Sequence, residues 1–483
     1  MTTQRIVLQR HDLRGILLLA AAFTFIPAAC LAVPFLSPLL TSDQWAVLLP
    51  VLAATAILIG FIVALRTYGP VSFLEIGVVY AGCVYAYGTY TMIRYMLNGF
   101  TLPDWTDSRM FVFNPAPGEL GRLTWLYTLY LVSFCVVYYA ARPARETPRA
   151  EVRDEPDKTM FIITALFLVV VRTGVAVVTS LYHLHAETYI EEYAAIQHLP
   201  RLPRQLFSWL LGSEQTLQIM FMLALLCHYR RRRWPLLTIL GLWTLLNLFR
   251  PGARTALFFL LLAVAVGFER IVRCIRLRTL LVAVCVGFVV YLAMGIKRAQ
   301  REEGEGKIEI THSYSEFEGI FANAVDIAYG AQAEGAFRGQ PKLYFGDVIA
   351  TIPQQFVPFQ KSSAAEWYAQ TYYTAYYAAG GGLAFGIVSE ALVGYGWPEL
   401  IWRGALIGIV FALIHRRVMR GSVSFWMLTL YVWSTVWCYQ TVRNTTFGLL
   451  MLFVQRMFVP FVAVKALSML LHVHRRLPLL RSA

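Results

Sequence analysis

Long apolar segments recur along almost the whole chain, and they constrain its fold more than any other feature. Many of them reach the ~20 apolar residues that a helix needs to cross the hydrocarbon core of a bilayer. The 483 residues are 58% hydrophobic, with a mean hydropathy of +0.56. The sequence therefore predicts an all-α polytopic membrane protein. The basic N-terminus leads into an apolar run without a small-residue cleavage site, which indicates a first membrane anchor and not a removed signal peptide.

Twelve segments are interpreted as transmembrane helices. They cover approximately 15–36, 45–65, 71–91, 123–141, 159–182, 208–228, 235–249, 255–268, 279–296, 397–414, 421–440 and 446–471. This arrangement divides the chain into three parts. Residues 1–296 hold the first nine helices, residues 297–396 form one large extracytoplasmic loop, and residues 397–483 hold the last three helices and a basic cytoplasmic tail.

Charge is distributed unequally between the two sides of the membrane in this arrangement. The loops on the side of both termini carry a net charge of +17 and the rest of the chain −3, which together make the net +14 of the chain. Cytoplasmic loops of membrane proteins are enriched in Lys and Arg. Both termini are therefore expected in the cytoplasm. The same rule explains the positive charge without a nucleic-acid partner.

The seven cysteines lie in apolar runs or beside a basic loop. Their spacing predicts neither a disulfide framework nor a metal site. We therefore expect no metal and no cofactor.

One segment within the large loop, "TAYYAAGGGLAFGIVSEALVGYG" (374–396), is apolar enough to span the membrane. A crossing there would move the basic loop "HRRVMRG" and the basic C-terminal tail to the outside. The segment also carries three consecutive glycines and Glu390. We therefore expect a re-entrant element that faces a protein-lined cavity, where irregular backbone is tolerated.

Arg250 and Arg254 flank a Pro-Gly break in "NLFRPGARTALFF", at the predicted outer turn between the seventh and eighth segments. Those segments of about 15 residues rise only ~22 Å, less than the ~30 Å hydrocarbon core, so the turn is expected to be recessed. Pro251 suits the first position of a helix, which puts Arg254 in the first turn of the next helix. Guanidinium groups at a helix N-terminus predict a phosphate site. Arg443, at the outer turn between the last two segments, is expected to line the same cavity, and snorkelling interfacial arginines are the alternative.

Two other arginines, Arg172 and Arg456, lie nearer the middle of predicted spans. A charge at that depth is costly unless it is paired. For both we expect a structural partner, namely Glu75, Glu214 or a backbone carbonyl.

Aromatic residues crowd the last third of the large loop. Six of them fall within eleven residues: Trp367, Tyr368, Tyr372, Tyr373, Tyr376 and Tyr377. Such a cluster is typical of an interfacial aromatic belt or of a platform for sugar rings. For proton transfer the loop offers His312, which titrates near neutral pH. It also offers Glu390 and the further carboxyls Glu316, Glu318 and Glu366.

Three elements occur in a fixed order: "RPGARTAL" opening a span, "IATIPQQFVPFQKS" in the large loop, and "GGGLAFGIVSEALVGYG" after it. They resemble the Gly-Arg-Thr signature, the Ile-Pro loop element and the Gly-rich stretch of bacterial O-antigen polymerases and related oligosaccharide repeat-unit polymerases (Wzy-type). The resemblance covers about half the chain, 235–460. It implies a fold similar to that of lipid-sugar-using (GT-C) glycosyltransferases and O-antigen ligases, and a place in the bacterial inner membrane.

The resemblance also implies a reaction. The enzyme would join undecaprenyl-pyrophosphate-linked oligosaccharide repeat units, as O-antigen, capsule or exopolysaccharide, at the periplasmic face. A hydroxyl of the incoming unit would attack the anomeric carbon of the growing chain, with His312 or Glu390 as general base. The substrate-binding residues would be Arg250, Arg254 and Arg443 on the departing pyrophosphate, together with Lys361, Trp367 and Tyr372.

The expected partners are the lipid-linked oligosaccharide, membrane lipid and a chain-length regulator. An O-antigen ligase, a transporter of lipids or sugars, and a non-catalytic scaffold for envelope assembly remain alternatives.

Overall fold

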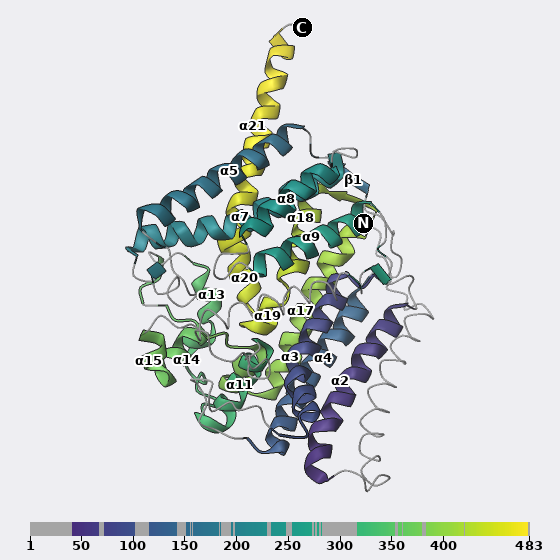
Figure 1. Ribbon diagram of the computed structural model, residues 1–483, viewed down its shortest axis with the longest axis vertical. Coiled ribbons are helices and arrows are strands. Elements are labelled where there is room, and N and C mark those ends of the chain that lie inside the picture. Colours follow the sequence, from purple (N-terminus) through teal and green to yellow (C-terminus); the bar gives the residue numbers. More distant parts are fainter. Residues whose placement is uncertain are drawn as a thin grey trace, which may run out of the picture.

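The computed structural model describes ten main stretches of the chain beyond residue 40. These are 41–66, 72–101, 115–142, 151–182, 199–228, 233–247, 254–272, 316–378, 383–419 and 421–481. Residues 155, 157, 353–355 and 360 within them are not described, nor are some of the side chains. A few isolated residues between these stretches are also described. This part of the chain is largely helical (Figure 1). The longer helices are α2 (Ser42–Arg66), α3 (Ile76–Leu97), α4 (Pro117–Ala141), α5 (Lys158–Leu181), α7 (Arg201–His228), α8 (Arg233–Asn247), α9 (Arg254–Ile271), α17 (Trp397–Val418), α18 (Phe425–Trp437) and α21 (Val459–Arg481).

Shorter elements connect these helices. They are β1 (Glu151–Asp154), α11 (Glu316–Val325), the π-helix η2 (Asp326–Gly330), α12 (Pro341–Tyr344), α13 (Gly346–Ala350), α14 (Ala364–Tyr372), α15 (Thr374–Ala378), α16 (Ile387–Val393), β2 (Ser422–Ser424), α19 (Gln440–Arg443), α20 (Gly448–Leu452) and the π-helix η4 (Phe453–Phe458).

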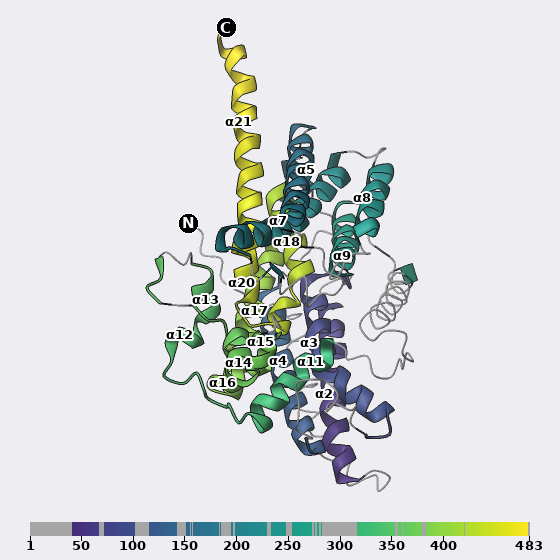
Figure 2. The same ribbon diagram turned by 60° about the vertical axis from the view of Figure 1, so that its left-hand side comes forward.

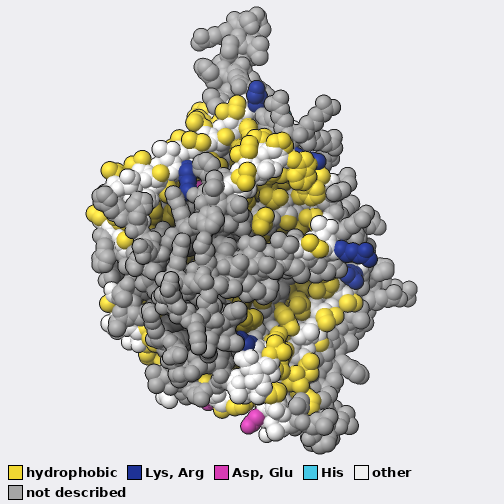
Figure 3. Space-filling model, in the orientation of Figure 1, with side chains coloured by type: hydrophobic (Ala, Val, Ile, Leu, Met, Phe, Trp, Pro, Cys, Tyr) yellow, Lys and Arg dark blue, Asp and Glu magenta, His cyan; other side chains and the backbone are white. Residues whose placement is uncertain are grey.

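Seven helices in the described residues are long and apolar enough to cross a membrane. They are α2, α3, α4, α5, residues 206–228 of α7, α17, and the continuous run of α20, η4 and α21 from 448 to 470. Apolar side chains dominate the coloured part of the face in Figure 3, as expected of a surface that lies against lipid. The chain is thus a multi-pass membrane protein, and seven of the twelve predicted spans are confirmed as helices of spanning length.

The other five predicted spans have different outcomes. Three correspond to α8, α9 and α18, which are helical but are not among the seven. The segment 15–36 lies outside the described residues, as does nearly all of 279–296. The total of twelve therefore stays a prediction.

Glycines allow α17 and α4 to pack closely. Gly404 and Gly408 lie four residues apart on α17, facing the backbone of α4. A Cβ on Gly404 would lie 2.9 Å from the carbonyl oxygen of Tyr130, and one on Gly408 would lie 3.0 Å from that of Phe134. Small residues at this spacing are a common means of helix association in lipid, where apolar burial gives little driving force between helices.

The loops that the charge pattern assigns to the cytoplasm meet at one end of the bundle. There β1 pairs in parallel with β2, with Glu151 opposite Ser422, and Arg270 of α9 donates a hydrogen bond to Tyr431 Oη of α18 (3.1 Å). The helices α11, α14 and α15 gather away from β1, at the lower left of Figure 1. This separation is what the predicted orientation requires. The side that faces the cytoplasm remains a prediction from charge.

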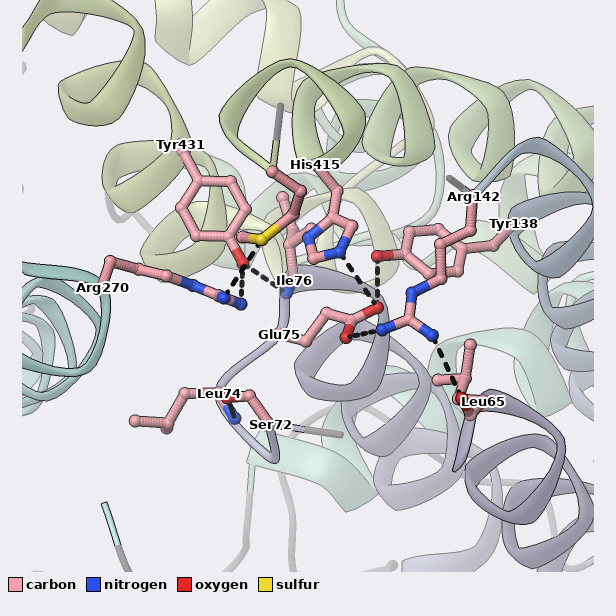
Figure 4. A network of polar contacts seen from close by, with 11 residues as sticks. Leu65, Ser72, Leu74, Glu75, Ile76, Tyr138, Arg142, Arg270, His415 and Tyr431 are labelled. Atoms are coloured by element: carbon pink, nitrogen blue, oxygen red, sulfur yellow. Dashed lines mark hydrogen bonds and ion pairs between the residues drawn. The ribbon is translucent and has the colours of Figure 1, made fainter. Parts of the chain in front are cut away.

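A buried charge network fixes the helices at the β1 end (Figure 4). Glu75, just before α3, accepts hydrogen bonds from Tyr138 Oη (2.8 Å) and Arg142 Nη2 (2.8 Å). Arg142 also donates to the carbonyl oxygen of Leu65 (3.2 Å), and His415 Nε2 lies 3.6 Å from the Glu75 carboxylate. Because buried charges are costly unless paired, the network holds the ends of α2, α3, α4 and α17 in one arrangement.

The segment expected to be re-entrant is not one continuous helix in its described part. It comprises α15, an extended stretch from 383 to 386, and the short buried helix α16. Gly386 has a φ of +91° and its N–H donates to the carbonyl oxygen of Asn444 (2.8 Å), which ties the extended stretch to the loop before α20. Irregular backbone is thus covered by protein at this point, while its depth in the membrane stays a prediction.

Candidate functional site

Arg443 lies at the end of the bundle away from β1, in an ion pair that remains accessible. Its Nε is 2.5 Å from Glu316 Oε1, and the side chains are 35% and 44% exposed, respectively. Tyr87 of α3 donates a second hydrogen bond to the same carboxylate oxygen (3.0 Å). Partial burial acts to lower the pKa of Arg443, but the attraction of Glu316 outweighs it and the pKa is raised. Arg443 is therefore a permanent positive charge where α3, α11 and α19 meet.

Aromatic side chains connect this arginine to the start of α9. The N–H of Arg443 donates to the carbonyl oxygen of Tyr439 (2.9 Å). The ring of Phe259 lies 5.5 Å from that of Tyr439 and 4.5 Å from that of Trp437. Phe259 follows Arg254 by five residues, which corresponds to ~7.5 Å along a helix. The first turn of α9 is thus directed toward the region of Arg443.

The two predicted arginines of the Pro-Gly turn are only partly described. The structure describes α9 from Arg254 onward and does not describe the residues just before it, so the position of Arg254 in a first turn stays a prediction. The side chain of Arg254 and all of Arg250 lie outside the described residues. Their contact with a phosphate group remains a prediction, as does their contact with Arg443.

Glu390, one of the two predicted bases, is buried and held on both carboxylate oxygens. Its Oε1 lies 2.5 Å from Arg403 Nη1, and its Oε2 accepts hydrogen bonds from the N–H (2.7 Å) and the Oγ1 (2.8 Å) of Thr446. Arg403 is also buried and pairs with Glu399 one helical turn earlier (2.6 Å). These contacts favour a structural role in which Glu390 joins α16, α17 and the loop before α20. The other predicted base, His312, lies outside the described residues.

Asp347 of α13 is a further carboxyl beside this cluster. It is buried, and burial together with the negative charge of Glu390 raises its pKa from 3.8 to about 6, while Thr445 and Arg403 act in the opposite direction. Sequence reasoning missed Asp347 and Arg403. The Glu399–Arg403 spacing of four residues is a local signal for an ion pair on α17, but nothing local indicates that Asp347 points inward.

The aromatic cluster of the large loop is built on α14 and α15. The ring of Trp367 packs edge-on against Phe337 (4.8 Å) and against the partly exposed Tyr372 (5.7 Å). Behind them, Tyr368 and Tyr373 donate hydrogen bonds to Asp326 Oδ2 (2.5 and 2.7 Å). Burial raises the pKa of Asp326, although both hydroxyls act to lower it.

This cluster brings Trp367 and Tyr372 into edge-on contact, and their binding of sugar rings stays a prediction. Lys361 precedes it and donates to the carbonyl oxygen of Ile352, so it serves the loop backbone in this structure.

The arginines predicted to have structural partners agree in part with expectation. Arg172 pairs with Glu214 (3.1 Å), whose carboxylate also accepts a hydrogen bond from Gln218 (3.3 Å). Glu75 instead pairs with Arg142, as described above. The guanidinium of Arg456 lies 5.3 Å from the centre of the Trp437 ring.

A comparison of the chain with protein-family models, with curated proteins and with solved structures finds no match. The functional assignment therefore depends on the residues themselves. What they provide is a partly exposed guanidinium at Arg443, an aromatic cluster on α14 and α15, and a buried charge cluster that joins α16, α17 and the loop before α20.

Proposed function

We propose that the chain polymerises lipid-pyrophosphate-linked oligosaccharide repeat units at the outer face of a bacterial inner membrane. The observation that carries the proposal is the partly exposed, charged Arg443, which is connected through Tyr439 to Phe259 in the N-terminal half of α9. A guanidinium beside a helix N-terminus suits an anion such as pyrophosphate. The resemblance of three sequence elements to repeat-unit polymerases supplies the reaction.

In this proposal, the arginines stabilise the charge that develops on the departing pyrophosphate. Arg443, Arg254 and Arg250 supply fixed positive charge, so the leaving group departs as an anion that is already paired. The glycosidic bond to the pyrophosphate oxygen breaks while a hydroxyl of the incoming unit attacks the same anomeric carbon. His312 accepts the proton of that hydroxyl. Trp367 and Tyr372 bind the sugar rings, which present apolar C–H faces and hydroxyls.

The test compares Arg443→Ala with Arg122→Ala in a host whose own gene is deleted. Arg122 is also an accessible arginine away from the β1 end, paired with Glu334 (3.2 Å), so it is a matched control for loss of one exposed ion pair. We expect the control to restore the ladder of surface polysaccharide on a gel. Arg443→Ala should leave single repeat units on their anchor, at equal protein level in the membrane.

Two other outcomes would reject the proposal. Polymer that accumulates on the lipid carrier while the anchor stays bare would indicate a ligase. An unchanged ladder in the deletion strain would exclude both reactions and favour transport.

A further inference from the structure

The short helix α13 and its flanks have an inside-out distribution of side chains. The carboxylate of Asp347 is buried beside the Glu390–Arg403 cluster, and Gly346 packs so closely that a Cβ would lie 2.5 Å from the carbonyl oxygen of Ser362. The large apolar side chains before and after α13 point the other way. Phe345 is 47%, Ile352 43% and Phe356 75% exposed.

A surface that faces water normally has polar side chains exposed and apolar side chains buried, and here the arrangement is reversed. A buried Asp and an exposed Phe are each unfavourable against an aqueous surface, and a group of exposed large apolar residues marks an interaction site. Against lipid the preference inverts, because polar groups are then directed toward protein and apolar side chains toward acyl chains.

Contacts place this element against the membrane-facing start of α17. The ring of Tyr344 on α12 lies 5.8 Å from that of Tyr395, just before α17, and 5.6 Å from the guanidinium carbon of Arg403. The first turns of α17 expose Trp397 and Trp402, and tryptophans at the end of a spanning helix mark the boundary of the bilayer. Figure 2 shows α12 and α13 on the flank of the bundle near α17. The exposed apolar group therefore continues a surface that already lies against lipid.

Lysines accompany the same element. Lys342 is exposed and its Nζ lies 4.6 Å from the centre of the Phe359 ring, while Lys361 holds the backbone at Ile352. Lysines beside inserted aromatic residues suit a surface of anionic lipid headgroups.

We propose that residues 341–352 and 356–359 form an interfacial anchor that inserts Phe345, Ile352 and Phe356 into the leaflet on the side of the large loop. The partner is the bilayer itself, with anionic phospholipid at the headgroup level. The anchor holds α13, and with it Asp347, at a fixed depth beside the Glu390–Arg403 cluster. This inference does not depend on the reaction proposed above.

The test places the photoreactive amino acid p-benzoylphenylalanine at position 356, where it replaces an aromatic residue of similar shape. The full-length protein is reconstituted in vesicles of phosphatidylethanolamine and phosphatidylglycerol, illuminated, and analysed by mass spectrometry. Position 370 on α14, an exposed glutamine of the same loop, is the matched control.

Phospholipid adducts at 356 and none at 370 are the expected result. Cross-links from 356 to protein would overturn the inference and show a second copy or another part of the chain on this surface. No adduct at 356 would show that it faces water, which also overturns the inference. Both variants should have the yield and the thermal midpoint of the wild-type protein. Equal values confirm that both proteins are folded and that their cross-links can be compared.

Discussion

Replacement of Glu390 by Gln tests whether this carboxylate is a base or part of the scaffold. The structure shows Glu390 between Arg403 Nη1 (2.5 Å) and two donors of Thr446 (2.7 and 2.8 Å). A glutamine keeps one oxygen that can accept a hydrogen bond, but its NH2 group then lies against a donor, either the guanidinium of Arg403 or the N–H and hydroxyl of Thr446. Removal of one partner of a buried ion pair costs about 3–5 kcal/mol. Because Arg403 keeps Glu399 at 2.6 Å, we expect a loss of unfolding free energy at or below the lower limit of that range, about 2–3 kcal/mol.

Thermal unfolding of the purified protein measures this loss, which corresponds to a fall of roughly 2–3 °C in the midpoint for a chain of this length. Glu399→Gln is the matched control, since it removes the other partner of the same arginine. If both carboxylates are structural, the two variants lose stability together and polymer formation declines in proportion to folded protein. A Glu390→Gln protein that is as stable as the wild type but inactive, beside an active Glu399→Gln protein, would refute the structural interpretation and restore Glu390 as a base.

Three further predictions concern other parts of the molecule. Glu316→Gln should strengthen binding of inorganic pyrophosphate by a factor of about 1.4 to 5 in isothermal titration, because a partly exposed pair of this kind is worth about 0.2–1 kcal/mol. Glu318→Gln, in the largely buried pair with Arg94, should lower the thermal midpoint instead. Equal affinity of wild type and Glu316→Gln would contradict the prediction. Gly408→Ala should cost about 1–3 kcal/mol of unfolding free energy by overpacking, whereas Gly82→Ala, which has open space around it, should be neutral or slightly stabilising in the same thermal assay. Asp347 has a pKa of about 6 in the folded protein against 3.8 for an ordinary carboxyl, so the folded state binds the proton more tightly. The contribution of Asp347 to stability therefore declines as the pH rises from about 4 through 6, by up to about 3 kcal/mol. The thermal midpoint of Asp347→Asn should not show this decline, and an equal decline in both proteins would refute the prediction.

Hydropathy and charge predict the spanning helices because the property that selects them is local. A run of ~20 apolar residues satisfies its backbone by forming a helix in lipid, and α2, α5 and α17 follow this rule with bounds close to the predicted ones. The Pro-Gly break before Arg254 is also a local signal for a helix start, and the structure describes α9 from Arg254 onward. Local signals thus account for most of the described bundle.

The candidate site is less predictable because its partners are remote in sequence. Glu316 meets Arg443 across 127 residues, and Glu390 meets Thr446 across 56. Such pairs form only after the helices have packed, so no window of sequence contains them. The inward direction of Asp347 has the same origin, because it depends on the close approach of Gly346 to the backbone at Ser362.

Three of the arginines in ion pairs, Arg142, Arg403 and Arg443, differ in what surrounds them, and this difference separates scaffold from site. Arg142 and Arg403 are buried, and each binds carboxylates and neighbouring groups that join several helices. A ligand that displaced a carboxylate from one of these buried arginines would have to lose its own hydration, which costs much free energy. Arg443 pairs with Glu316 through its buried Nε, but both side chains keep a third or more of their surface exposed, so an incoming anion meets a smaller desolvation cost there. A ligand that must bind and leave in every turnover is therefore better served by Arg443 than by either buried arginine.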